Sequence, residues 1–323
     1  MAEQFQINDA GETFTVSRNP LIAVEKQVMA RVRPTKFREL LRIDSSMASW
    51  LESVEYDKVT QTAEWTGVEE FTSQFAAATV KVSKESYDLY ELMSGYEYTN
   101  RELRRASETG FPLQTVKAQA VMNKAETVLE HIAADGTKDG TNKLSGTLEG
   151  FFNQSSVTPY TDPSVATTSY ESLNFNTADE QDTFVETVIA DAVLMERKAE
   201  IDTKETTNID TLVYPLSMAS LFQRGSRNSG GRSIINLMLD RLRHVERIEF
   251  WNKAETAGAG GLRRIVGYNS RDEDAAKFVL AQAPTPGRQF VMMNKVAIPV
   301  TMVVGGFQTK IPESMIYVDS VAA

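Results

Sequence analysis

The sequence predicts an α+β protein, because helical patterns and strand patterns occupy separate blocks of the chain. Residues 112–136 carry the strongest helical pattern, with apolar residues along one stripe. Residues 50–83 alternate β-branched or aromatic residues with polar ones, which is typical of strands. A second mixed block begins near Asn176, and the chain ends in further strand patterns. The 323 residues, 41% of them hydrophobic, suffice for two hydrophobic cores.

The composition narrows the possible classes of function. The chain has no cysteine, which excludes disulfides and thiolate chemistry. Its two histidines, His131 and His244, are too few for a histidine-based metal site or a catalytic triad. A net charge of −10 argues against sequence-specific binding to nucleic acid, although it is compatible with enclosing nucleic acid. No apolar run reaches the ~18 residues of a membrane span and no signal pattern opens the chain, so we expect a protein made and used in a cytoplasm.

The first 48 residues begin with a polar stretch and continue with mixed basic and aliphatic residues. The aliphatic residues stand at helical spacings, but Pro34 interrupts the pattern. A short helix of this kind is marginal alone and needs a surface to pack on. It either docks on the chain's own core or forms an arm on a neighbouring subunit, and the residues do not decide between the two.

The strand pattern that follows predicts a two-stranded antiparallel ribbon. Val54 and Tyr56 alternate with charged residues, and Val80 and Val82 alternate with polar ones. The polar segment between them, residues 66–75, predicts an irregular and partly acidic tip. A ribbon of two strands is marginal alone, so it should lie on its own domain or on another subunit.

Two helices are predicted after the ribbon. Thr99 and Glu102 form a capping box, which indicates a short helix ending at Gly110. The long helix begins at Pro112 and ends at Gly136, a residue suited to a left-handed stop. We interpret its apolar stripe as a core-facing surface, made by Ala118, Val121, Met122, Ala125, Val128, Leu129 and Ile132. The glycine-rich segment after the long helix has no GK[ST] ending, so it is not a phosphate-binding loop.

The second block predicts a mixed α/β region. Thr177 and Glu180 form another capping box, for a helix lined by Phe184, Val188, Ala192 and Met195. A strand over 211–214 and a helix opened by Ser233 come next, and strand-like pieces follow at 248–251, 264–268 and 278–281. The end of the chain predicts a hairpin that returns to the domain of the long helix. Its strands cover 298–304 and 307–318 around a Gly305-Gly306 turn, with Pro312 marking an edge or a bulge.

Three clusters could carry chemistry, and each has a simpler explanation. The charged run 271–274 could bind a cation, but such a run is more often a solvated turn. The glycines of 258–261 lack the GxGxxG spacing of a dinucleotide site. Arg224, Arg227 and Arg232 could contact phosphate, but a mobile surface loop is the commoner explanation. We therefore predict no catalytic, cofactor-binding or metal-binding residues, and no enzyme.

The order of the elements is the most informative feature of the sequence. A basic arm, a long hairpin, a capped helix, a long helix and a glycine-aromatic turn precede an α/β insert and a final Gly-Gly segment. This order resembles the major capsid proteins of tailed bacteriophages with the Hong Kong ninety-seven fold. The matching residues are Gly95, Tyr96, Tyr98, Thr99, Glu102, Leu103, Gly150, Asn153, Gly305, Gly306, Pro312, Tyr317 and Asp319. Phe151-Phe152 replaces the usual pair of leucines, which is a change of packing.

The resemblance implies a domain plan. It assigns 1–48 to an N-arm, 49–85 to an extended E-loop hairpin and 86–164 to a P-domain with the long spine helix. It assigns 165–290 to an A-domain and 291–323 to a C-terminal return to the P-domain sheet. Some relatives cross-link a lysine of the E-loop to an asparagine of a neighbour. Lys58 and Lys81 lie in the predicted ribbon, but no flanking motif supports that chemistry here.

The resemblance also implies a function. We expect a structural protein that self-assembles, as hexamers and pentamers, into the icosahedral head shell around a double-stranded DNA phage genome. Scaffold, portal and decoration proteins are further candidate partners, no membrane is expected, and the virion would be assembled in the host cytoplasm. One alternative is an encapsulin-type bacterial compartment shell. A second alternative, of another class, is a cytosolic hydrolase that uses the acidic turns.

Overall fold

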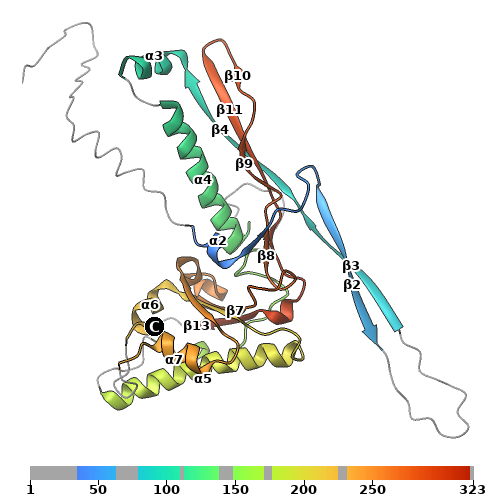
Figure 1. Cartoon of the computed structure of the whole chain (residues 1–323), viewed down its shortest axis with the longest axis vertical. Helices are drawn as coiled ribbons and strands as arrows, with labels where there is room; N and C mark the ends of the chain where they lie inside the picture. Colours follow the sequence, from blue (N-terminus) through green and yellow to red (C-terminus); the bar gives the residue numbers. More distant parts are fainter. Residues whose placement is uncertain are drawn as a thin grey trace, which may run out of the picture. The chain divides into compact units, whose positions relative to one another are not determined.

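The computed structural model describes residues 35–62, 79–109, 113–137, 148–170, 177–224 and 231–320 (Figure 1). Residues from Thr35 onward form one compact unit. The predicted arm up to Pro34, the ribbon tip and the helix boundaries at Gly110 and Pro112 lie outside the described residues. Within the described residues, helices and four sheets confirm the α+β class.

A four-stranded sheet separates two hydrophobic cores. In spatial order its strands are β13 (Ile316–Ser320), β7 (Arg263–Tyr268), β5 (Thr211–Pro215) and β6 (Arg247–Trp251). Because successive side chains of a strand point to opposite faces, Tyr317 enters one core while its neighbours Ile316 and Val318 enter the other. This sheet is therefore the layer between the two large cores.

The core on one face of this sheet is covered by α5 (Ala178–Asp202) and α7 (Ile234–Arg241), which lie side by side (Figure 1). The predicted capping box of α5 is present, with the Glu180 N–H donating to the Thr177 hydroxyl and the Thr177 N–H donating to the Glu180 carboxylate. The predicted core residues of α5 are buried, and Ser233 caps α7 as expected.

The core on the other face surrounds the end of α4 (Leu113–Asp135). Its centre is Phe151, whose ring lies between 4.9 and 6.0 Å from the rings of Phe152, Trp251, Tyr268 and Phe307. The short helix α2 (Phe37–Leu40) also belongs to this core, because Phe37 and Leu40 are buried in it. The chain just after the N-terminal unit is thus part of the compact body.

The long helix α4 runs beside a sheet that contains two ten-residue strands. These are β4 (Tyr90–Thr99) and β11 (Lys295–Val304), which pair antiparallel along their whole length. The other edge of β11 carries β9 (Gln282–Pro286) and β10 (Phe290–Val291). Helix α3 (Asn100–Thr109) follows β4 and precedes α4 along the chain, and it begins at the predicted Thr99–Glu102 capping box.

The ribbon consists of β2 (Ser53–Thr62) and β3 (Thr79–Asp88), which confirms the prediction of two long antiparallel strands. Leu89 anchors its base in a small apolar cluster with Val279 and Val303. A third sheet lies there, in the order β1 (Arg42–Asp44), β8 (Lys277–Val279) and β12 (Gly306–Gln308).

The described chain also contains short helical turns. These are η1 (Ser164–Ala166), η3 (Leu216–Met218), α6 (Ala219–Phe222), η4 (Asn252–Glu255), η5 (Ala259–Gly261) and η6 (Pro312–Ser314). None of the described helices is long and apolar enough to cross a membrane.

Two expectations need correction. The apolar stripe of α4 is buried only in its C-terminal half, whereas Met122 is 39% exposed, because the helix outruns the core that covers its end. The predicted C-terminal hairpin is wrong. Strand β12 pairs with β8 rather than with β11, and the chain then passes through η6 at Pro312 to β13, which pairs with β7.

Candidate functional site

Residues of the charged run 271–274 form ion pairs and hydrogen bonds with other residues of the same chain. Glu273 forms an ion pair with Arg42, and the Asp274 carboxylate lies 2.5 Å from the Lys310 ammonium. Asp272 accepts the N–H of Asp274. Across the described residues, no group of three or more acidic or histidine side chains is placed to hold a metal ion. The run is a surface turn in which Glu273 and Asp274 have basic partners within the chain.

The other sequence candidates do not come together either. The glycine turn at 258–261 directs the Ala259 N–H to the Asp319 carboxylate of the same chain. Arg232 forms an ion pair with Asp240 at 2.5 Å, while Arg227 lies outside the described residues. His131 and His244 contact different carboxylates, those of Asp135 and Glu200.

A buried cluster of hydrogen bonds contains Tyr317 and Asp319, two of the residues on which the family resemblance rests. Arg264, on β7, donates two hydrogen bonds to the Asp319 carboxylate of β13, at 2.6 and 2.8 Å. The same guanidinium donates to the Phe152 carbonyl and lies 4.7 Å from the centre of the Tyr317 ring. The Tyr317 hydroxyl donates to the Phe151 carbonyl at 2.5 Å. These contacts hold the turn after α4 on the central sheet, so the motif residues serve structure.

The turn at Gly150 meets the end of α4 at very short range. Gly136 has φ +68°, which confirms the predicted left-handed stop, and a Cβ on Gly136 or on Gly150 would overlap the backbone opposite. Asn153 closes the contact, because its side chain accepts the Gly150 N–H at 2.5 Å and donates to the Asp135 carbonyl at 2.7 Å. A glycine pair and an asparagine are therefore required by geometry.

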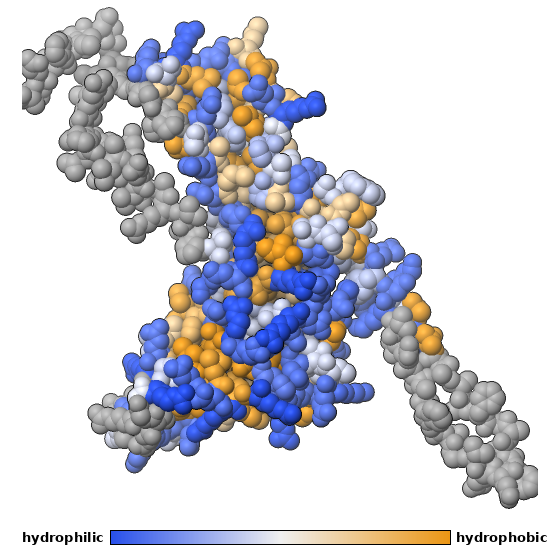
Figure 2. Space-filling model, viewed as in Figure 1, coloured by the Kyte–Doolittle hydropathy of each residue, from blue (hydrophilic) through white to orange (hydrophobic). Residues whose placement is uncertain are grey.

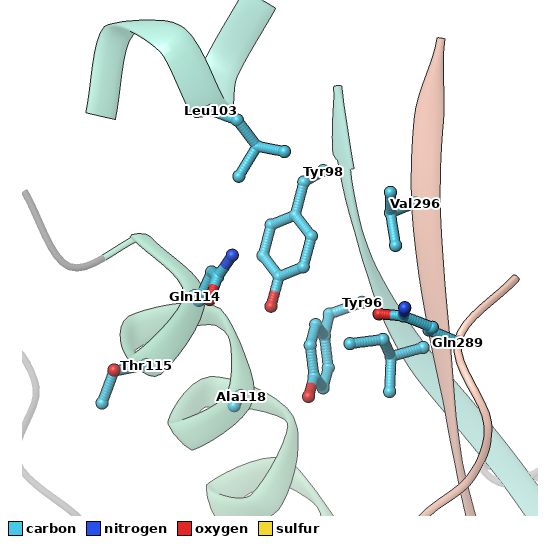
Figure 3. A pocket seen from close by; sticks show the side chains of 9 residues that line it. Tyr96, Tyr98, Leu103, Gln114, Thr115, Ala118, Gln289 and Val296 are labelled. Carbon is cyan, nitrogen blue, oxygen red and sulfur yellow. The ribbon is translucent and has the colours of Figure 1, made fainter. Parts of the chain in front are cut away.

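Tyr96 and Tyr98 line an open groove of about 490 Å³ between α4 and the β4–β11 sheet (Figure 3). Their rings, 5.6 Å apart, point from β4 toward Gln114 and Ala118 of α4. Burial raises the pKa of the Tyr98 hydroxyl above its ordinary value, with a smaller contribution from Tyr96. The groove offers the aromatic faces of the two tyrosines and the amide groups of Gln114 and Gln289.

Several large apolar side chains are exposed on the surface. Strand β10 and the two residues after it carry a run of four, Phe290 to Met293, of which Met293 is 99% exposed. Figure 2 shows apolar atoms at the β10–β11 end of the sheet. On the ribbon, Val80 and Val82 are exposed by 58% and 59%. Exposed apolar groups that gather in this way mark interaction surfaces.

A sequence model of the major capsid protein family matches residues 61–321, which is most of the chain. The chain belongs to the major capsid protein family. This membership supports the shell-protein function over the compartment-shell and hydrolase alternatives, and it implies a structural role. No curated protein sequence matches the chain.

Solved structures show the same fold at low sequence identity. The capsid chain of Myoviridae Phage XM1 is 13% identical, with a TM-score of 0.72 over 89% of this chain and 92% of that one. The capsid of a native GTA particle is 14% identical, with a TM-score of 0.55 over 90% and 92%. A virus-like particle from Pyrococcus furiosus is 12% identical, with a TM-score of 0.50 over 93% and 97%. The Hong Kong ninety-seven-type fold predicted from the sequence is thereby confirmed.

Sequence reasoning missed the role of Arg264. A single arginine in an apolar strand pattern gives no signal of its own, since its partner Asp319 is far away in the chain. It also missed the exposed run at Phe290 to Met293, which stands out only once the structure shows that nothing in the described part of the chain covers it.

Proposed function

We propose that this major capsid protein forms the icosahedral head shell of a tailed phage, as hexamers and pentamers around double-stranded DNA. The observation that carries the proposal is family membership combined with a compact body that leaves a two-stranded ribbon and several apolar groups exposed. Such surfaces suit many moderate contacts with neighbouring copies, which add up through multivalency.

We also propose the domain plan that the family resemblance implies, with the N-arm, E-loop hairpin, P-domain, A-domain and C-terminal return at the bounds given above. The strands β2 and β3 support an E-loop hairpin, and α4 beside β4 and β11 supports a P-domain. Support for the C-terminal return comes from β11 alone, because β13 belongs to the sheet between the two cores.

Packaged DNA would be enclosed without being gripped in a sequence-specific way. The chain carries 44 acidic and 34 basic residues, so its net charge of −10 repels phosphate. We place the protein in the virion, with assembly in the host cytoplasm, and scaffold, portal or decoration proteins are candidate partners for the same shell.

The compartment-shell alternative has the same physical basis, because a shell of this fold can hold protein cargo instead of DNA. The test is to purify particles, examine them by electron microscopy and analyse their contents after nuclease treatment. Icosahedral particles that protect double-stranded DNA support the proposal. Particles that contain a single enzyme and no DNA contradict it, and a soluble monomer contradicts any shell function.

A further inference from the structure

Helix α5 presents one exposed stripe to solvent. The helix lies on the outside of the compact unit (Figure 1), and exposed side chains recur along it at intervals of three and four residues. Residues three and four apart share one face of a helix, so these side chains form a continuous surface. We call this surface the α5 stripe; its members are Thr183, Glu186, Ala190, Val193, Arg197 and Ile201.

The α5 stripe combines an apolar centre with two opposite charges. Its centre consists of Ala190 and Val193, of which Val193 is 40% exposed, and Ile201 near its end is 61% exposed. Glu186 flanks the centre on the side of the helix N-terminus, and Arg197 flanks it on the side of the C-terminus. Within the described chain, neither of these two charged side chains forms a salt bridge or a hydrogen bond. A partner with matching groups could therefore satisfy both charges and cover the centre.

The α5 stripe is complementary to itself when two copies lie antiparallel. Ala190 and Val193 are equally far along the helix from the point midway between residues 191 and 192, and so are Glu186 and Arg197. A twofold axis at this point therefore sets the alanine of one copy against the valine of the other, and the glutamate against the arginine. Each contact occurs twice by symmetry. The small alanine also lets the two helices approach closely at the centre.

Other arrangements of two α5 helices fit less well. A parallel pair would place Glu186 opposite Glu186 and Arg197 opposite Arg197, where like charges repel each other. An antiparallel pair shifted by one heptad would place Glu186 opposite Ala190, a charge against an apolar group. The antiparallel arrangement also sets each helix N-terminus beside the C-terminus of the partner, which the helix dipoles favour. Charge and hydrophobicity therefore select the same orientation and register.

We propose that free subunits of this protein pair through the α5 stripe as an antiparallel, twofold-symmetric dimer. The contact joins the same patch on both copies, so it closes at two copies. It thus differs from the contacts of hexamers and pentamers, which join different patches and form rings. A contact along one helix is smaller than the ~1,200–2,000 Å² of a stable interface, so the dimer exchanges with the monomer. The inference goes beyond the proposed function, because it concerns the subunit before assembly.

Charge reversal tests the pairing, with sedimentation velocity of the particle-free fraction measured over a series of concentrations. We expect the wild-type chain to form a dimer whose share rises with concentration. Glu186→Arg and Arg197→Glu each replace two attractive pairs by two repulsive ones, so each should weaken the dimer by about tenfold without changing the melting temperature. The double variant Glu186→Arg/Arg197→Glu restores opposite charges and should recover the dimer. The matched control, Arg104→Glu on the exposed surface of α3, makes the same change of net charge and should leave the dimer unchanged.

Disulfide trapping reports the orientation, because the natural chain has no cysteine. A mixture of Ala190→Cys and Val193→Cys chains should give more reducible dimer on oxidation than Ala190→Cys chains alone, whereas a parallel pair would reverse this order. The pairing is overturned by a wild-type chain without a dimer, by single charge variants that pair as well as wild type, or by a double variant that does not recover. More dimer from Ala190→Cys chains alone overturns the antiparallel orientation. None of these outcomes depends on the contents of particles, so the proposed function is tested independently.

Discussion

Replacing Arg264 by leucine should strongly destabilise the isolated subunit. Arg264 is 7% exposed, and its guanidinium donates two hydrogen bonds to the Asp319 carboxylate and one to the Phe152 carbonyl. Leucine would leave a nearly buried carboxylate without its partner, which costs about 3–5 kcal/mol in comparable sites. It would also leave a buried carbonyl unpaired, a further cost of about 1–3 kcal/mol. Because such terms overlap, we expect a loss of about 4 kcal/mol.

The assay is urea unfolding of the unassembled subunit, followed by tryptophan fluorescence. The double variant Arg264→Leu/Asp319→Leu should recover part of the loss, because it leaves no lone charge behind. The control is Arg38→Leu, which breaks a pair with Glu126 of similar geometry at the surface and should cost less than about 1 kcal/mol. An Arg264→Leu loss no larger than that of the control, or a double variant less stable than the single one, would refute the reasoning.

Three further predictions concern other parts of the fold. Partial burial raises the pKa of Asp44, but the Lys277 ammonium and Ser46 lower it by more, to about 2. The carboxylate therefore stabilises the fold above about pH 4, and this stabilisation is lost as the pH falls toward 2. Asp44→Asn should flatten the acid limb of a curve of melting temperature against pH between those values. Gly150→Ala should cost about 3 kcal/mol or more in urea unfolding, whereas Gly231→Ala, with nothing within 4 Å, should cost only the ~1–2 kcal/mol of its left-handed backbone. Deleting residues 1–30 should leave the melting temperature unchanged but impair particle formation in sedimentation, whereas Phe37→Ala, in the core, should cost about 3–5 kcal/mol of subunit stability.

Features set by neighbouring residues were predictable from the sequence. The capping boxes at Thr99 and Thr177 and the left-handed stop at Gly136 each depend on a few consecutive residues, and all three are present. The ribbon was predictable because its strands are adjacent in the chain and show a period of two.

Features set by distant residues were not predictable in the same way. The Gly305-Gly306 pair suggested a local hairpin, but each flanking strand finds a partner elsewhere, β11 with β4 and β12 with β8. The apolar stripe of α4 follows the helical period, but this period does not tell which turns of the helix are covered by the rest of the protein. The junction at Arg264 depends on strand register and burial, which only the folded chain defines.

The position of β13 has a consequence for how the protein folds during its synthesis. This strand is the last element described, and its side chains alternate between the two cores, with Tyr317 in one and Ile316 and Val318 in the other. Neither core can close until β13 has been synthesised and has left the exit tunnel. Chains that terminate before β13 therefore lack two complete cores, and they should be degraded instead of being built into particles as defective copies.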